Sequence, residues 1–169
     1  METLNQDERY IKRCIELANM AGNAGEFPFG AVVVFNDEVI SEGYNDALEQ
    51  KEVYRHAEML ALVDAQKKLT REQLSECVLY SSVEPCAMCS FAVQELNIRR
   101  VVFGLRSPIM GGYSKWHILQ DELINTTFPN TFGRTPEIVP DVLKDQVIGG
   151  WKLWNNEKWE RMYAKGVFK

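Results

Sequence analysis

The chain has 169 residues, which suffices for one packed domain, predicted here as residues 1–169, and is too few for two ordinary ones. Its formal charge of −5 makes a nucleic-acid partner unexpected though not excluded, since affinity for phosphates depends heavily on Lys and Arg. No apolar run approaches the roughly 20 residues of a membrane span, and the polar, acidic N-terminus is unlike a secretory leader. We therefore expect no membrane partner, a cytoplasmic location and reduced cysteines.

Hydrophobic periodicity and turn residues predict the elements in chain order. The expected order is a helix over 5–21, strands over 31–35 and 39–44 joined by a turn at 36–37, a helix over 57–69, a strand over 77–80, a helix over 87–96, a strand over 100–104, a short helix over 116–124, a strand at 138–139 and a long helix over 143–163. In the helix over 57–69, Met59, Leu60 and Val63 are expected to face inward. The alternation predicts an α/β fold whose last strands are parallel.

Residues 106–136 form a long connection that is richer in Gly, Pro, Asn and Thr than the segments around it. Because connections of this length are seldom passive, we expect a lid or pocket wall there. Trp116 and His117 are placed to exclude water from such a pocket. The other tryptophans lie at helical spacing in the last helix and are expected to pack in the core or against a second subunit: Trp151, Trp154 and Trp159.

Two short motifs carry the chemistry, His56-Ala57-Glu58 and Pro85-Cys86-Ala87-Met88-Cys89, and each opens a predicted helix. Cys86 and Cys89 are three residues apart, so on a helix their sulfurs lie on one face and can bind a single ion. The unpaired N–H groups and the dipole of the first turn favour thiolate over thiol. Pro85 suits this boundary because it needs no N–H partner.

The number of available ligands indicates a catalytic rather than a structural zinc site. A closed structural site needs four protein ligands. The chain has one Cys-x-x-Cys and two histidines, and Cys14 and Cys77 lie singly in apolar segments where they are expected to be buried. Three convincing ligands remain: His56, Cys86 and Cys89. The fourth position of one Zn²⁺ per chain is then open to water, and Glu58 is close enough to move that water's protons.

Each motif alone carries little weight. A lone Cys-x-x-Cys in a cytosolic protein is often a redox pair or half of a structural zinc site. A lone His-x-Glu is close to uninformative. Together, in this order and each at a helix start, they favour a catalytic zinc over the alternative of a non-catalytic zinc-binding or redox module.

With the segments 28–32, 84–89 and 101–104, these motifs resemble the cytidine deaminase-like superfamily. Within it, they are similar to the branch that holds tRNA adenosine deaminases, guanine deaminases and fungal-type cytosine deaminases. The resemblance covers roughly residues 8–106. It implies a three-layer α/β/α fold with a five-stranded mixed sheet and helices on both faces, zinc-dependent deamination of an amino-substituted ring, and commonly a homodimer.

The resemblance also implies substrate contacts. Asn45 matches a position whose side-chain amide contacts the substrate, and an amide suits the edge of a heterocycle; from its place alone, a turn former is the simpler interpretation. Phe29 matches a pocket-wall position, with core packing as an equal alternative. The backbone N–H groups of Ala57 and Cys86 are implied as donors to the transition state.

Two departures from the family pattern bear on the substrate. Segment 105–112 lacks the Asp with which guanine deaminases contact their substrate, and segment 113–136 is longer than in the tRNA enzymes. With the acidic charge, these features predict a small-molecule substrate, a free purine or pyrimidine base or a nucleoside. The alternative is a tRNA-specific adenosine-to-inosine deaminase, favoured by the length of the loop between Asn45 and His56 and by the strand at 101–104.

Overall fold

The computed structural model describes residues 5–169. The elements are α1 (Gln6–Asn23), β1 (Gly30–Phe35), β2 (Glu38–Tyr44), α2 (Ala47–Gln50), α3 (Ala57–Lys68), α4 (Arg71–Leu74), β3 (Val78–Val83), α5 (Ala87–Glu95), β4 (Arg100–Leu105), the 3₁₀ helix η1 (Ile118–Gln120), α6 (Glu122–Thr127), β5 (Glu137–Val139) and α7 (Lys144–Ala164). Each predicted strand is present with shifted boundaries, and so are the predicted helices over 5–21, 57–69 and 87–96. The single helix predicted over 116–124 is instead two elements, η1 and α6. Over residues 5–169, no helix combines the length and the apolar character needed to cross a membrane.

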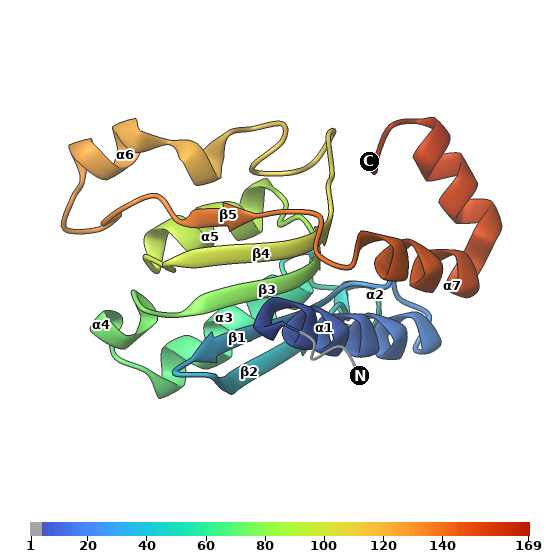
Figure 1. Cartoon of the computed structure of the whole chain (residues 1–169), viewed down its shortest axis with the longest axis horizontal. Helices are drawn as coiled ribbons and strands as arrows, with labels where there is room; N and C mark the ends of the chain where they lie inside the picture. Colours follow the sequence, from blue (N-terminus) through green and yellow to red (C-terminus); the bar gives the residue numbers. More distant parts are fainter. Residues whose placement is uncertain (1–4) are drawn as a thin grey trace.

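The strands form one mixed sheet in the order β2-β1-β3-β4-β5 (Figure 1). β1 pairs antiparallel with β2 and with β3, whereas β3, β4 and β5 run parallel, which confirms the predicted five-stranded mixed sheet with parallel last strands. In the β3–β4 register Val83 lies opposite Leu105. The segments that follow these two strands therefore leave the sheet at the same edge, where ligands of open α/β sheets usually bind.

Helices cover both faces of the sheet, so the predicted three-layer α/β/α architecture is confirmed (Figure 1). α1 and α7 pack on one face around Val32 and Trp151. α3 and α5 pack on the other face around Leu62 and Phe103. Because strand residues point alternately to opposite faces, neighbouring residues of β4 enter different cores. Cys14 and Cys77 are fully buried, as their apolar surroundings predicted.

Helix α3 buries a different face from the predicted one. Its buried residues are Ala57, Glu58, Ala61, Leu62 and Ala65. Val63 is 41% exposed, and Met59 and Leu60 are only half-buried, so the expectation that they face inward is wrong. The cause is close packing, since a Cβ at Gly43 of β2 would lie 2.2 Å from the carbonyl oxygen of Ala57. At this contact the helix presents the small residues Ala57 and Ala61.

The C-terminal helix α7 is broken, whereas one continuous helix was predicted. Asn155 has φ −162° and ψ 95°, which are not helical values. Its side-chain Oδ1 accepts a hydrogen bond from the backbone N–H of Lys158 at 2.9 Å and so caps the second half of the helix. The break lets the end of the chain return toward the loop after β4 (Figure 1).

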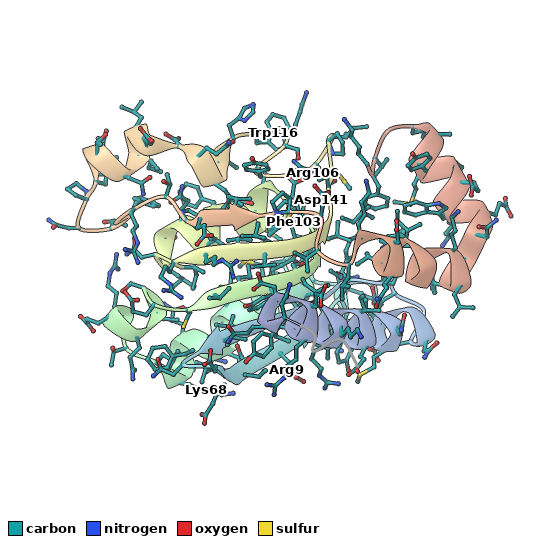
Figure 2. The ribbon with its side chains drawn as sticks, viewed as in Figure 1. Arg9, Lys68, Phe103, Arg106, Trp116 and Asp141 are labelled. Atoms are coloured by element: carbon teal, nitrogen blue, oxygen red, sulfur yellow. The ribbon has the colours of Figure 1, made fainter. Side chains whose placement is uncertain are left out.

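Contacts of its last residues hold this returning segment in place. The N–H of Lys169 donates to the carbonyl of Arg106 at 3.1 Å. Arg106 itself is anchored by a 2.8 Å ion pair between its side chain and that of Asp141, which lies beside it in Figure 2. The ring of Phe168 stacks on that of Trp159 at 5.7 Å between centroids. Trp151 and Trp159 are buried, which confirms core packing for both, and Trp154 is partly buried against the same cluster.

Candidate metal centre and active site

Two helix starts bring the three predicted metal ligands together. His56 immediately precedes α3, Cys86 immediately precedes α5, and Cys89 lies in the first turn of α5. α5 begins just beyond β3, and α3 packs on the same face of the sheet. The three ligand atoms lie within 4.8 Å of one another. His56 and Cys86 are half-buried and Cys89 is buried, so one side of the cluster remains accessible.

The spacing of these atoms fits a tetrahedral zinc ion. With Zn–S about 2.3 Å and Zn–N about 2.0 Å, tetrahedral angles require about 3.8 Å between sulfurs and about 3.5 Å between sulfur and nitrogen. The sulfurs of Cys86 and Cys89 are 3.6 Å apart, and His56 Nδ1 lies 3.5 and 3.7 Å from them. His56, Cys86 and Cys89 therefore form a candidate zinc site with three protein ligands, the number typical of catalytic zinc.

Electrostatics at the cluster also suit a cation. The hydrogen bond with Cys89 and, after it, the one with His56 lower the pKa of Cys86 to about 4 against the opposing effect of burial. The same contact with Cys86, together with burial, raises the pKa of Cys89 well above its usual value. The hydrogen bond to Cys86 raises the pKa of His56. The pair thus holds a thiolate that a divalent ion can bind directly.

Glu58 is the carboxylate nearest the three ligands. Its side chain is buried, with Oε2 3.7 Å from the sulfur of Cys89 and Oε1 accepting a hydrogen bond from Ser81 Oγ at 3.0 Å. Burial, followed by the charge of Cys86, raises its pKa to about 7. A buried carboxyl group with so few protein partners beside a metal cluster is suited to exchanging protons with a ligand.

A cavity of about 280 Å³ opens beside the cluster. It is small for a ligand pocket and suits a single flat ring system better than a large ligand. The polar groups in its wall come from the metal cluster, two glutamates and a serine: His56, Cys86, Glu58, Glu84 and Ser107. Apolar side chains form the rest: Phe27, Phe29, Val83, Met110, Met162 and Phe168.

Of the predicted substrate contacts, the structure places Phe29 in the cavity wall, with its ring edge-on to Trp151 at 5.3 Å. Asn45 is buried beside this wall, since its N–H donates to the carbonyl of Phe29 at 3.1 Å, but it is not among the residues that line the cavity. Ala57 is buried at the first position of α3, where a backbone N–H has no acceptor within its own helix.

Sequence reasoning missed the partner of Asn45. Glu26 is buried, and its Oε2 accepts a hydrogen bond from Asn45 Nδ2 at 3.0 Å. A carboxylate can only accept, so this bond fixes which end of the Asn45 amide faces Glu26. The position of Glu26 two residues before the 28–32 motif was the available signal.

Trp116 and His117 are not brought to the cavity. Trp116 is 56% exposed and lies at the outer edge of the molecule (Figure 2). His117 Nδ1 forms a hydrogen bond with the side-chain Oε1 of Gln120 at 3.0 Å. Of the long connection 106–136, only Ser107 and Met110 line the cavity.

The C-terminal segment supplies wall residues instead. Met162 and Phe168 line the cavity from beyond the break at Asn155. No pattern in the sequence marked these two residues, because an apolar residue in a terminal helix is most simply explained by core packing.

Fold, cluster and buried carboxylate together define a zinc-dependent deaminase domain. The family described as the cytidine and deoxycytidylate deaminase zinc-binding region matches residues 4–105. The chain belongs to this family. The match ends where β4 ends, so the metal ligands and Glu58 lie inside it and residues 106–169 lie outside it.

Individual relatives extend the likeness. The tRNA-specific adenosine deaminase of Bacillus subtilis is 36% identical over 146 residues, covering 86% of each chain. A structure from a study of A-to-I editing by tRNA:A34 deaminases superposes with a TM-score of 0.74 at 26% identity, covering 84% of this chain and 98% of that one. A structure solved in complex with 2,6-diaminopurine superposes with a TM-score of 0.69 at 26% identity, covering 92% of this chain and 84% of that one.

Proposed function

We propose that this protein hydrolyses the exocyclic C–N bond of an amino-substituted heterocycle, using His56, Cys86 and Cys89 to hold zinc and Glu58 to transfer protons. One observation carries this proposal: a buried carboxylate lies beside a three-ligand metal site and faces a ring-sized cavity. A zinc ion held there would lower the pKa of a water molecule to about 7 and so provide a nucleophile at neutral pH.

Glu58 performs the proton transfers in this proposal. Its carboxylate takes one proton from the attacking water and delivers it to the ring nitrogen next to the reacting carbon. It then passes the remaining proton of that water to the departing amine, so that water and an aminated ring give a carbonyl and ammonia. Transfers of this kind contribute about 10²- to 10⁴-fold to a rate. Phe29 and the other aromatic wall residues orient the ring by contact with its face.

Adenosine in a tRNA anticodon loop is the substrate that the comparisons favour. The curated relatives are tRNA-specific adenosine deaminases and span most of this chain. This is the alternative from the sequence analysis rather than the leading prediction of a free base or nucleoside. The three proposed zinc ligands lie within residues 4–105, which match the zinc-binding family, so the same chemistry would serve either substrate.

A free base remains the second candidate because of one structural feature. Met162 and Phe168 form part of the cavity wall, so the C-terminal segment borders the space where the ring would enter. An anticodon loop needs room for the nucleotides on both sides of the flipped base, whereas a free base does not. The 2,6-diaminopurine bound in a structural relative shows that a similar fold accepts a free purine.

Ammonia release separates the candidates. The zinc-loaded protein is assayed on an adenosine-containing anticodon stem-loop and, in parallel, on free adenine, guanine, cytosine, 2,6-diaminopurine and their nucleosides. Turnover of the stem-loop with loss of activity at high salt supports the tRNA substrate, because phosphate contacts weaken with salt. Turnover of free rings alone supports the second candidate. No release from any compound by the fully loaded protein would overturn the proposed function and favour a non-catalytic zinc module.

We also propose a cytoplasmic homodimer. The outer face of α3 and the loop before it carry exposed apolar side chains, including Val53 at 80%, Tyr54 at 48% and Val63 at 41%. Neighbouring exposed apolar groups of this size commonly mark a protein interface. Val63→Glu should convert a dimer to a monomer, which light scattering coupled to size exclusion would measure. A wild-type protein that runs as a monomer at all concentrations would contradict the proposal.

A further inference from the structure

A second buried glutamate lines the cavity and has a different environment from Glu58. Glu84 is 3% exposed and directly precedes the metal-binding turn 85–89. Its carboxylate accepts four hydrogen bonds, all from the loop that follows β4. The donors are Ser107 N at 2.9 Å, Tyr113 N at 3.1 Å, Ser114 N at 2.6 Å and Ser114 Oγ at 2.6 Å.

Four bonds use the whole acceptor capacity of an ionised carboxylate, which offers about four lone-pair sites. Glu84 therefore has no free site with which to receive a proton from a substrate. Glu58, by contrast, accepts from one hydroxyl and has a thiol at 3.7 Å. The two glutamates border the same cavity, yet only Glu58 has acceptor sites to spare.

The loop that Glu84 holds is also joined to the metal-binding turn through the backbone. Gly112 N donates to the carbonyl of Pro85 at 2.9 Å, and Gly111 forms an isolated β-bridge with Cys86. A Cβ at Gly111 would lie 1.9 Å from Glu84 Oε1. Glycine is thus needed where the loop passes the carboxylate. Met110, the residue before Gly111, lines the cavity.

We propose that Glu84 is a positioning residue whose carboxylate holds loop 107–114 in register with the metal-binding turn and so fixes Met110 in the cavity wall. The inference rests on the proposed function for its effect on catalysis. The loop geometry itself stands apart from any substrate. Glu84 thereby links the half of the molecule that binds zinc to the wall that receives the ring.

Glu84→Gln tests this role with little change in shape. An amide keeps one acceptor oxygen but points an NH₂ group at backbone N–H donors, so about half of the hydrogen bonds are lost. We expect backbone amides of Tyr113 and Ser114 to exchange hydrogen at least about tenfold faster, because their acceptor is lost or weakened. We expect KM to rise roughly 10-fold or more, kcat to change less than about threefold, and zinc content to stay the same.

Two further variants keep the test decisive. Ser114→Ala removes one of the four bonds and leaves the charge, so it should raise KM by a smaller factor, and it serves if Glu84→Gln fails to fold. Glu95→Gln makes the same chemical change on the exposed face of α5 and should leave KM and exchange unaltered.

Unchanged amide exchange in both Glu84→Gln and Ser114→Ala would overturn the proposed loop contact, whatever the activity. Faster exchange with an unchanged KM would overturn the positioning role. If the wild-type protein releases no ammonia from any ring, the proposed function fails, and the exchange rates still decide whether Glu84 holds the loop.

Discussion

Residues up to the end of β4 and residues 106–169 contribute different parts of the site. The first region provides the zinc ligands and Glu58, and it is the region that the family match covers. The second provides Met110, Met162 and Phe168 of the cavity wall and lies beyond that match. We therefore assign the proposed reaction to the first region and infer that the second region contributes to the choice of substrate.

The two regions also differ in the contacts that position their site residues. Metal ligands sit at the starts of helices whose buried faces pack directly on the sheet. The wall residues of the second region sit on a loop and on a broken helix, which depend on individual contacts such as those of Glu84 and Asn155. Substitution of a metal ligand or of Glu58 should therefore abolish chemistry, whereas substitution of Met110, Met162 or Phe168 should change substrate binding and local stability.

The largest effect is expected from Glu58→Gln. It removes the proton carrier while keeping the shape, so kcat should fall by about 10²- to 10⁴-fold with zinc content and fold retained. Ammonia release under saturating substrate and metal analysis of the same sample measure both. Glu95→Gln, exposed on α5, is the matched control. A variant that keeps more than half of the wild-type kcat would remove Glu58 from the mechanism.

Phe168→Ala should show the opposite pattern. The ring lines the cavity, and its centroid lies 4.8 Å from that of Trp151. Its loss should raise KM about 10- to 200-fold and lower the free energy of unfolding by about 3–5 kcal/mol. Zinc content should not change. Tyr163→Ala, with a ring 52% exposed, provides a milder control. A fall in kcat with KM unchanged would contradict a role of Phe168 in substrate binding alone.

Acid stability should depend on Asp7, at the opposite end of the sheet from the cavity. Burial alone would raise its pKa, but hydrogen bonds from Arg100 and Tyr80 lower it overall. A folded pKa below the unfolded value of about 3.9 stabilises the fold above that pH, and this stabilisation is lost as pH falls through the folded pKa.

Asp7→Asn should therefore cost about 2 kcal/mol at pH 7, and the difference from wild type should shrink as the pH falls through the folded pKa of Asp7. Urea unfolding at several pH values measures it. A difference that is constant with pH would mean that the charge of Asp7 is irrelevant.

The smallest effect is expected from Asn155→Ala. Loss of the cap on Lys158 N should lower the free energy of unfolding by about 1 kcal/mol and raise KM modestly through the wall residues beyond it. Thermal melts and steady-state kinetics would show this. Asn156→Ala, at the exposed neighbouring position, is the control. Equal effects of the two variants would show that the break does not depend on the cap.

The sequence predicted the first region well because its signals are local. Cys86 and Cys89 lie within a single turn, His56 is two residues before Glu58, and the strands are continuous apolar runs. The buried face of α3 was mispredicted because hydrophobicity suggested Val63, whereas the close approach at Gly43 selects alanines. Small side chains where α3 meets β2, as well as hydrophobicity, decide which side of that helix is inside.

The wall of the second region could not be predicted for a different reason. Phe168 reaches the cavity because the chain changes direction at Asn155. A single Asn in a helical pattern does not predict such a break. Trp116 was a plausible wall residue from its place in the long connection, yet the structure leaves it exposed. Contacts between segments far apart in sequence have no local signature.

Deamination at this site requires that three side chains hold one zinc ion and leave a position for water. X-ray absorption spectroscopy on the metal-loaded protein, with elemental analysis of the same sample, measures this coordination. We expect one zinc per chain with two sulfur neighbours at about 2.3 Å, one imidazole, and one further oxygen from solvent. Absence of zinc binding, or a fourth side chain as ligand in place of solvent, would rule out the proposed site.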